Sequence, residues 1–497
     1  METSIIRERP RLRAEKLADL LLAGMAVGYI GLYVYIALSR LSYPFDLDWM
    51  EGGMVDHVRR LLAGEPLYVA PSIDFVPYIY PPLYFYISAA ASALIGPGLL
   101  ALRLISWIAS LVAFLLIGSI VWKETRDRVA ALLSVGLIAA TFSISGGWFD
   151  LARIDMLFIA LTLAGLYAVR FSPSPLLAAI FFGLAALTKQ TAIAMAVAAV
   201  LYYAMTNRRS GLIFATAFAA WMLITTLLLD TASDGWYRYY VFELPGQHAW
   251  VWHMLVDFWR FDLAPVLPAG LIGLAVSGVS LRQDRERFLF YGLMLGALVG
   301  SAWFSRLHEG GYINGLIPAF IGIAIMFGLG VAYFRRQGER RYALISVLAV
   351  LQFALLIYNP AAHFVTSADR AAHAHLVETI AAIDGEVLVV HHGEVTSQAG
   401  QETIYAHRMA IEDVMRGGDG PARTMLQKSI DMALEQQRFA AILFDGSRND
   451  FILVDPYFYL LQAYYVGRGP VFPPEFDNAL WPTTGLQIRP YYLFVPK

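Results

Sequence analysis

The chain has 497 residues, of which 58% are hydrophobic and only 15% are charged, and its formal net charge is -2. A soluble globular protein is nearer half apolar and a quarter charged, so this composition excludes an ordinary soluble domain. The absence of cysteine excludes disulfides and thiolate metal sites, and no basic stripe indicates binding to nucleic acid.

Apolar runs recur along the sequence at about the length that crosses a bilayer as a helix, which predicts an α-helical polytopic membrane protein. The eleven predicted spans lie at residues 17–38, 99–122, 129–146, 155–170, 175–188, 190–206, 211–229, 262–281, 288–304, 313–334 and 342–358. The first run is too long for the core of a signal peptide, so we expect a retained anchor after a basic N-terminal segment, 1–16. The predicted transmembrane domain is therefore 17–358.

One further apolar segment, Pro81 to Gly96, decides the topology. It is short for a span, and we interpret it as a helix on the outer surface, within a first outer loop at residues 39–97. This choice places 18 lysines and arginines in the inner segments and eight in the outer ones before residue 359. The positive-inside rule then predicts a cytoplasmic N-terminus and an extracytoplasmic C-terminus.

Two short predicted helices, 175–188 and 190–206, meet at Lys189. Their far ends carry Arg170 and Arg208, which both favour the cytoplasm, so a single long helix would violate the charge rule. We expect the two helices to meet at a polar cavity on the outer side, where irregular backbone is tolerated.

Residues 359–497 contain no spanning run and are predicted to form a small extracytoplasmic α/β domain. Helical patterns at 368–383 and 422–437 alternate with β-type runs at 387–390 and 440–444, and the closing LQIRPYYLFVP resembles a strand. This region holds six of the ten histidines, which we expect to be surface residues rather than a metal site.

The first outer loop begins with FDLDWMEGG, which places Asp46, Asp48 and Glu51 directly after an apolar run. Ionisable groups are costly at membrane depth, so such residues are functional candidates. The alternative is a solvated turn that caps the following helix.

Other polar residues fall on the same predicted side of the membrane. They are Tyr80, Tyr84, Asp150, Arg153, Asp155, Lys189, Arg306, His308, Glu309, Tyr312 and Asn314. Structural alternatives exist: a salt bridge within the second outer loop, a lysine that reaches the interface, and a solvent-exposed Arg306–His308 pair.

Acids and cations on one face form a site for a reaction that needs both a base and an anion clamp. Arginine and lysine bind phosphate, and a carboxylate within reach of a hydroxyl acts as a general base. The aromatic surroundings suit a long apolar tail. The pattern predicts attack by a hydroxyl on a phosphate-activated group that a lipid carries.

The order of these motifs resembles the GT-C superfamily of membrane glycosyltransferases, particularly the bacterial relatives of protein O-mannosyltransferases and of lipid A aminoarabinose transferase. The resemblance covers roughly residues 15–330. It rests on DLDWMEGG, LLAGEPLY, YPPLYFY, the Arg153–Asp155 pair, LTKQ and HEGGYIN.

The resemblance implies inverting transfer of a sugar from a polyprenyl-phosphate donor to a hydroxyl on a glycan, glycolipid or protein. The reaction would take place on the outer face of a prokaryotic inner membrane. Asp48 corresponds best to the family's base, but Trp49 and Met50 separate it from Glu51, whereas many relatives have adjacent acids. Asp46, Asp48 and Glu51 therefore stay alternatives.

Lys189 matches the family's TK element and is expected near the donor phosphate, together with Arg153, Arg306 and His308. The substrate pocket is expected to include Tyr80, Tyr84, Glu309, Tyr312 and Asn314.

Asp150 and Asp155 resemble the acids that hold a metal in oligosaccharyl transferases, so a divalent cation, Mg or Mn, is a secondary expectation, although the WWD signature of those enzymes is absent. The alternative function is a lipid-linked sugar flippase or another transporter. Against it, the charges gather on one side and the sequence has no repeated half.

Overall fold

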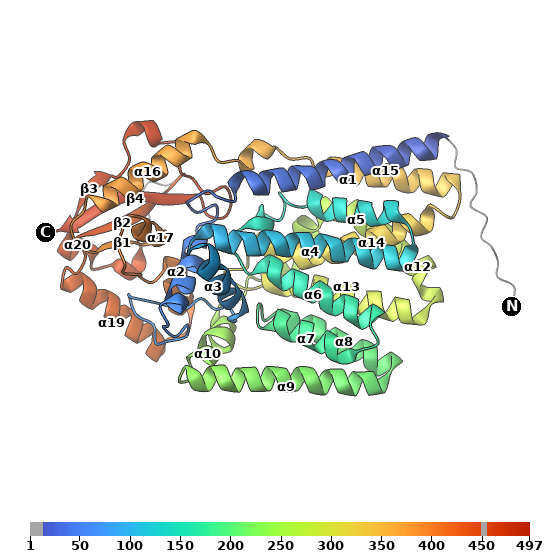
Figure 1. Cartoon of the computed structure of the whole chain (residues 1–497), viewed down its shortest axis with the longest axis horizontal. Helices are drawn as coiled ribbons and strands as arrows, with labels where there is room; N and C mark the ends of the chain where they lie inside the picture. The colour runs from blue at the N-terminus through green and yellow to red at the C-terminus, as the bar shows by residue number, and fades with distance from the viewer. Residues whose placement is uncertain (1–12, 449–454) are drawn as a thin grey trace.

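Most helices of the chain run side by side in one bundle, and a small sheet with its own helices lies at one end of that bundle (Figure 1). The computed structural model describes residues 13–448 and 455–497. The chain enters the bundle at the end far from the sheet, and the last helix of the bundle leads back towards it (Figure 1).

Within the described residues, each of the eleven predicted spans coincides with a helix. These are α1 (Arg13–Arg40), α4 (Leu99–Thr125), α5 (Arg128–Ala140), α6 (Asp155–Phe171), α7 (Pro175–Ala186), α8 (Ala192–Thr206), α9 (Arg208–Ala232), α12 (Leu267–Val279), α13 (Arg285–Arg306), α14 (Ile317–Phe334) and α15 (Glu339–Leu355). By length and apolar composition, six described helices can each cross a bilayer, or seven if one bent pair counts as a span.

The centre of the bundle is α14, which is apolar on every side and buried along its whole length. It packs against α4, α5, α12 and α13. In contrast, α9 is apolar but only 6% buried, and its main neighbours are α7 and α8. An apolar helix that other helices leave uncovered faces lipid in a membrane protein, so α9 marks the rim of the bundle.

The first predicted outer loop contains two helices, α2 (Glu51–Leu62) and α3 (Leu83–Ile95). Both lie at the end of the bundle that carries the sheet, and α3 packs against α2 and α4 (Figure 1). The predicted surface helix at 81–96 is therefore α3. A series of short helical turns after α9, including α10 (Trp236–Arg238) and α11 (Met254–Asp257), leads the chain into α12.

The C-terminal region folds around a mixed four-stranded sheet with the order β1-β2-β4-β3. Its strands are β1 (Val387–Val389), β2 (Ala441–Ser447), β3 (Tyr465–Pro470) and β4 (Ile488–Pro496). Its helices are α16 (Ser367–Ala381), α17 (Glu394–Gln398), α18 (Arg408–Arg416), α19 (Pro421–Glu435) and α20 (Leu461–Tyr464). Among the strand pairs of the described residues, β1 and β2 are parallel and the other two pairs are antiparallel, as expected for β1 and β2 because helices join them. The predicted fold class is confirmed, although β3 was not foreseen.

The expectation that the C-terminal histidines are surface residues is wrong. Five of the six are buried, and His392 is only 1% exposed. The five are His363, His373, His391, His392 and His407. They are buried because this region packs closely against the first outer loop: α17 contacts α2, and Gln398 donates a hydrogen bond to the carbonyl of Pro44. The sheet domain therefore helps to enclose the acidic segment FDLDWMEGG.

Candidate active site

Glu51, the first residue of α2, is fully enclosed and hydrogen-bonded on both carboxylate oxygens. Arg103 binds it in a bidentate manner, with Nε–Oε1 and Nη2–Oε2 distances of 2.9 and 2.6 Å. The backbone N–H groups of Leu47 and Ala152 donate two further bonds. Burial opposes ionisation, but Arg103 and these donors outweigh it and lower the pKa of Glu51. Glu51 thus holds the acidic segment to α4 and to the second loop.

Asp48 is also fully buried, but its two carboxylate oxygens differ. Arg153 donates a 2.6 Å hydrogen bond to Oδ2, whereas Oδ1 has no hydrogen-bond partner among the residues that the structure describes. The same guanidinium reaches the Tyr80 hydroxyl at 3.1 Å. Burial, only partly offset by Arg153, raises the pKa of Asp48 to about 7. A carboxylate with one free oxygen and a pKa near neutrality has the properties of a general base.

A loop from the C-terminal domain covers Asp48. The backbone N–H of Thr484 donates to the carbonyl of Leu47, and Thr483 donates its hydroxyl to the same oxygen. Gly485 has a φ of +73°, and a Cβ at this position would overlap Asp48 Oδ1 and the ring of Trp49. Only a glycine therefore allows the loop to approach the carboxylate so closely.

Asp46 forms a different contact, across the boundary between the two parts of the chain. His392 donates a 2.6 Å hydrogen bond from Nδ1 to Asp46 Oδ2, and its Nε2 lies 3.3 Å from Asp445 Oδ1. Burial lowers the pKa of His392, but the two carboxylates outweigh it and raise this pKa to about 10. His391 also binds Asp445, so Asp46 is the end of a buried chain of alternating acids and imidazoles.

Lys189 lies at the junction of α7 and α8, as predicted, and binds Asp155 at the start of α6. The Nζ–Oδ1 distance is 2.7 Å, and Asn314 donates to both oxygens of the same carboxylate at 3.1 Å. The next residue, Gln190, donates its amide to the carbonyls of Ile79 and Val241 and so fixes the junction. Asp155, Lys189 and Asn314, which are far apart in the sequence, thus form one polar cluster.

The Asp48 and Lys189 clusters are neighbours, because Arg153 and Asp155 lie two positions apart where α6 begins. The Arg153 guanidinium lies over the ring of Trp148, 5.6 Å from its centroid, and Trp148 packs against Tyr312. Burial and the charge of Asp48 raise the pKa of Tyr312. Tyr80 binds Arg153 of the first cluster, and Asn314 binds Asp155 of the second. Tyr312 packs beside them, against Trp148.

The remaining predicted cations lie in another group. Arg306 binds Asp262 at 2.8 Å and the carbonyl of Gly311 at 2.6 Å. His308 packs between Trp250 and Phe304, with ring centroids 4.4 and 4.6 Å away. We call the group around this SRLHEGGYIN loop the aromatic rim; it consists of Trp250, Phe304, Arg306 and His308.

Glu309, in the same loop, faces Arg416 of α18 at 3.5 Å. Tyr84 is fully buried and hydrogen-bonds Ser106 and the carbonyl of Leu102, so it supports the packing of α3 on α4.

Asp150 and Asp155 were the expected metal ligands. Asp150 is bound in a bidentate manner by Arg40, at 2.6 and 2.7 Å, and Asp155 is occupied by Lys189 and Asn314. Within the described residues, no group of three or more histidine, cysteine or acidic side chains could hold a metal ion. The residues present do not fit a resident divalent cation, and dependence on a metal stays a prediction.

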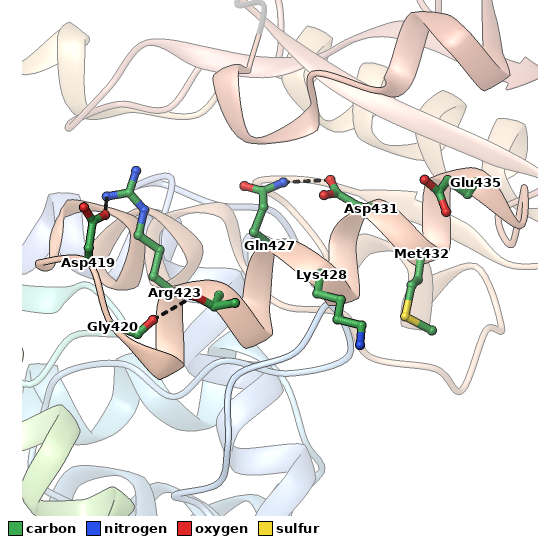
Figure 2. A pocket seen from close by; sticks show the side chains of 9 residues that line it. Asp419, Gly420, Arg423, Gln427, Lys428, Asp431, Met432 and Glu435 are labelled. Atoms are coloured by element: carbon green, nitrogen blue, oxygen red, sulfur yellow. Dashed lines mark hydrogen bonds and ion pairs between the residues drawn. The ribbon is translucent and has the colours of Figure 1, made fainter.

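A shallow hollow lies on the C-terminal domain, along one face of α19 (Figure 2). Its lining comes from this helix and the turn before it, and Asp419 pairs there with Arg423 while Gln427 binds Asp431. None of the predicted site residues lines it. These short-range pairs along one helix are typical of a solvated helix surface, so we do not place the active site there.

Sequence reasoning did not identify Arg103 or His392 as site residues. Arg103 could have been recognised, because a lone arginine in an apolar span needs a buried acid as its partner. His392 is far from the first loop in the sequence, and only the fold brings it to Asp46.

Residues 80–236 match the family model described as dolichyl-phosphate-mannose-protein mannosyltransferase. A search of curated proteins found no match. Among solved structures, ArnT from Cupriavidus metallidurans bound to undecaprenyl phosphate has a TM-score of 0.56 at 14% identity, over 94% of this chain and 98% of that one. Its apo state gives 0.58 at 13% identity, over 95% and 98%.

The archaeal oligosaccharyltransferase AglB from Archaeoglobus fulgidus, in complex with an inhibitory peptide and a dolichol-phosphate, has a TM-score of 0.52. Its identity is 11%, and the match covers 90% of this chain and 80% of that chain. The similarity extends over nearly the whole chain, including the C-terminal domain. The resemblance to the GT-C superfamily is thereby confirmed: the chain has the fold of these membrane glycosyltransferases, and a third of it matches one of their family models.

Proposed function

We propose that the protein is an inverting glycosyltransferase that moves a sugar from a polyprenyl-phosphate donor to an acceptor hydroxyl. The observation that carries this proposal is Asp48, a buried carboxylate with one oxygen fixed by Arg153 and the other free. The fold supports a lipid-linked donor, since one similar structure is described with undecaprenyl phosphate and another with dolichol-phosphate.

In the proposed reaction, the acceptor oxygen attacks the anomeric carbon of the donor sugar and forms the new glycosidic bond. The bond from that carbon to the phosphate oxygen breaks, and the lipid phosphate leaves with the electron pair. Asp48 Oδ1 takes the proton of the acceptor hydroxyl. Because a single displacement enters opposite the leaving phosphate, the anomeric configuration inverts.

Lys189 is the best candidate for binding the leaving phosphate. Its Nζ has three hydrogens and donates one of them to Asp155, which orients the ammonium without using all of its donors. Arg153 donates hydrogen bonds to Asp48 and to the Tyr80 hydroxyl, so a second cation lies beside the proposed base. Arg306 and His308 in the aromatic rim are secondary candidates for the phosphate or the first part of the lipid.

The same proposal places the N-terminus in the cytoplasm and the C-terminal domain on the outer face of the inner membrane. The first-loop helices α2 and α3 and the helix α10 lie at the end of the bundle that carries the sheet (Figure 1). The polar residues predicted for outer loops thus gather at one end. The acceptor is a glycan, a glycolipid or a protein.

The decisive experiment incubates the purified protein with undecaprenyl-phosphate sugars and an extract of envelope acceptors, and measures released undecaprenyl phosphate. We expect Asp48→Asn to reduce release by about 10²–10⁴-fold, the range typical of a lost general base. Asp74→Asn, in the same loop but solvent-exposed and paired with Arg438, is the matched control and should retain full activity.

Wild-type turnover by Asp48→Asn would exclude Asp48 as the base. Transport of intact donor across vesicles, without release of undecaprenyl phosphate, would refute the proposed reaction and identify a flippase. A metal requirement is checked in the same assay, by comparing release with and without EDTA.

A further inference from the structure

A carboxylate on the C-terminal domain, Asp413 of α18, is buried but makes no hydrogen bond through its side chain to any residue that the structure describes. It is 3% exposed. Arg416, one turn further along the helix, is engaged by Glu412 and Glu309 instead. A buried carboxylate without donors is costly, so packing alone does not account for this residue.

Helix α18 is fixed above the site at both ends. At its start, the cap residue His407 donates from Nε2 to the carbonyl of Trp49, in the acidic segment, at 3.0 Å. Along its length, His248 donates to the carbonyl of Asp413 at 3.1 Å. At its end, the N–H of Gly418 binds the side chain of Gln247.

A further contact ties α18 to the HEGGYIN loop, through Arg416 and Glu309. The helix therefore spans from the acidic segment to the aromatic rim, and its position does not depend on Asp413.

Asp413 lies within electrostatic reach of the centre of the site. Burial raises its pKa to about 7, while Arg416 and Arg153 act in the opposite direction. Three carboxylates, Asp48, Asp155 and Asp413, all act on the pKa of the Tyr80 hydroxyl. On the helix, Asp413 lies between His407, which binds Trp49 beside the proposed base, and Arg416, which pairs with Glu309 of the HEGGYIN loop.

We propose that Asp413 is a sugar-binding residue, which accepts hydrogen bonds from hydroxyl groups of the sugar that the donor lipid carries. This inference rests on the proposed function. It assigns α18 a direct part in recognising the sugar, in addition to covering the site. An unpaired carboxylate offers two acceptor oxygens, which suits adjacent hydroxyls on a sugar ring. Asp48 Oδ1 is kept for the acceptor proton.

The test measures binding of the full-length protein in nanodiscs to undecaprenyl phosphate and to undecaprenyl-phosphate glucose, galactose, mannose and arabinose. Loss of the hydrogen bonds from the sugar hydroxyls to the carboxylate oxygens should weaken binding of the preferred sugar lipid by about 10-fold or more in Asp413→Asn. Binding of undecaprenyl phosphate itself should change by less than about twofold, since the variant keeps the shape of the side chain. Asp419→Asn, an exposed carboxylate just beyond α18, removes the same charge and should change neither affinity.

Unchanged affinity of Asp413→Asn for the preferred sugar lipid would overturn the inference. An equal loss for undecaprenyl phosphate would also overturn it, because the defect would then be general. If the wild type bound no sugar lipid more tightly than undecaprenyl phosphate, no sugar-binding residue would exist. Each of these results is separate from the failure of the proposed function, which is the absence of undecaprenyl phosphate release from every sugar lipid.

Discussion

Arg153 binds one oxygen of Asp48 at 2.6 Å, although the two residues lie 105 positions apart in the sequence. The other oxygen of Asp48 has no hydrogen-bond partner among the described residues. A fully paired carboxylate such as Glu51 has no lone pair left for a substrate, whereas a carboxylate without a cation would be neutral when buried. The half-paired state keeps Asp48 oriented and able to take a proton near neutral pH.

The first prediction concerns pH. In the proposed reaction Asp48 takes a proton only when it is ionised, and burial raises its pKa to about 7, so the protonated form, which cannot serve as the base, dominates at lower pH. We expect kcat/KM to rise about tenfold per pH unit below pH 7 and then to level off. Release of undecaprenyl phosphate between pH 5.5 and 8.5 gives the profile.

Two controls test whether the rise of kcat/KM below pH 7 comes from Asp48 rather than from another titrating group or from unfolding. Asp413→Asn should keep the rising limb, because Asp48 carries it, even if the affinity for the donor falls. The melting temperature of the wild type should also be measured at each pH, so that unfolding is not mistaken for titration. A rate that stayed flat or fell from pH 5.5 to 7 would contradict Asp48 as the base.

The second prediction concerns stability. Glu51→Gln leaves Arg103 charged and fully buried without its counter-ion, which should cost about 3–5 kcal/mol of unfolding free energy. Thermal unfolding in detergent measures the change. The control is Glu65→Gln, which removes an exposed acid that pairs with the half-buried Arg60 and should cost no more than about 0.5 kcal/mol. Equal melting temperatures for the two variants would show that Glu51 does not hold the loop.

The third prediction concerns the donor phosphate. Lys189→Gln removes the ammonium beside Asp155, and we expect the Kd for undecaprenyl phosphate to rise about tenfold or more, as for a lost charge-assisted contact. Lys428→Gln, on the exposed face of α19 in Figure 2, is the matched control for loss of one positive charge. If both variants bound undecaprenyl phosphate like the wild type, Lys189 would have no part in phosphate binding.

The fourth prediction concerns the loop over Asp48. The Cβ of Gly485→Ala would overlap Asp48 Oδ1 and Trp49, so we expect a large loss of kcat with undecaprenyl phosphate binding retained. Gly469→Ala controls for the left-handed backbone, since Gly469 has a φ of +101° and open space around it. Strain alone costs about 1–2 kcal/mol and should lower stability but not turnover. Full activity of Gly485→Ala would mean that the loop lies away from Asp48 during catalysis.

The helices were predictable because hydropathy is a local property: each apolar run long enough to span a bilayer became a helix. The acids of FDLDWMEGG and Lys189 were also identifiable, since a charge beside an apolar run is costly wherever the chain folds. The sequence could not show that Glu51 is paired by Arg103, Asp46 by His392 and Asp48 by Arg153.

The C-terminal domain was the least predictable part of the site. Three of its four strands, β1, β2 and β4, and two of its helices follow from local patterns, but the burial of its histidines depends on how it packs against the first loop. Asp413 belongs to no motif, and its place between the acidic segment and the HEGGYIN loop follows from the position of α18. Such relationships arise from tertiary packing, which periodicity and composition do not encode.

The contact between Asp46 and His392 also sets an order of events during biosynthesis. The two residues are 346 positions apart, which at about 5–20 residues per second corresponds to roughly 20–70 s of translation. The acidic segment therefore emerges from the ribosome long before the imidazole that neutralises it. A chain that stops before β1 lacks both that imidazole and the loop over Asp48. A C-terminal truncation is thus an unfinished enzyme rather than a smaller working one.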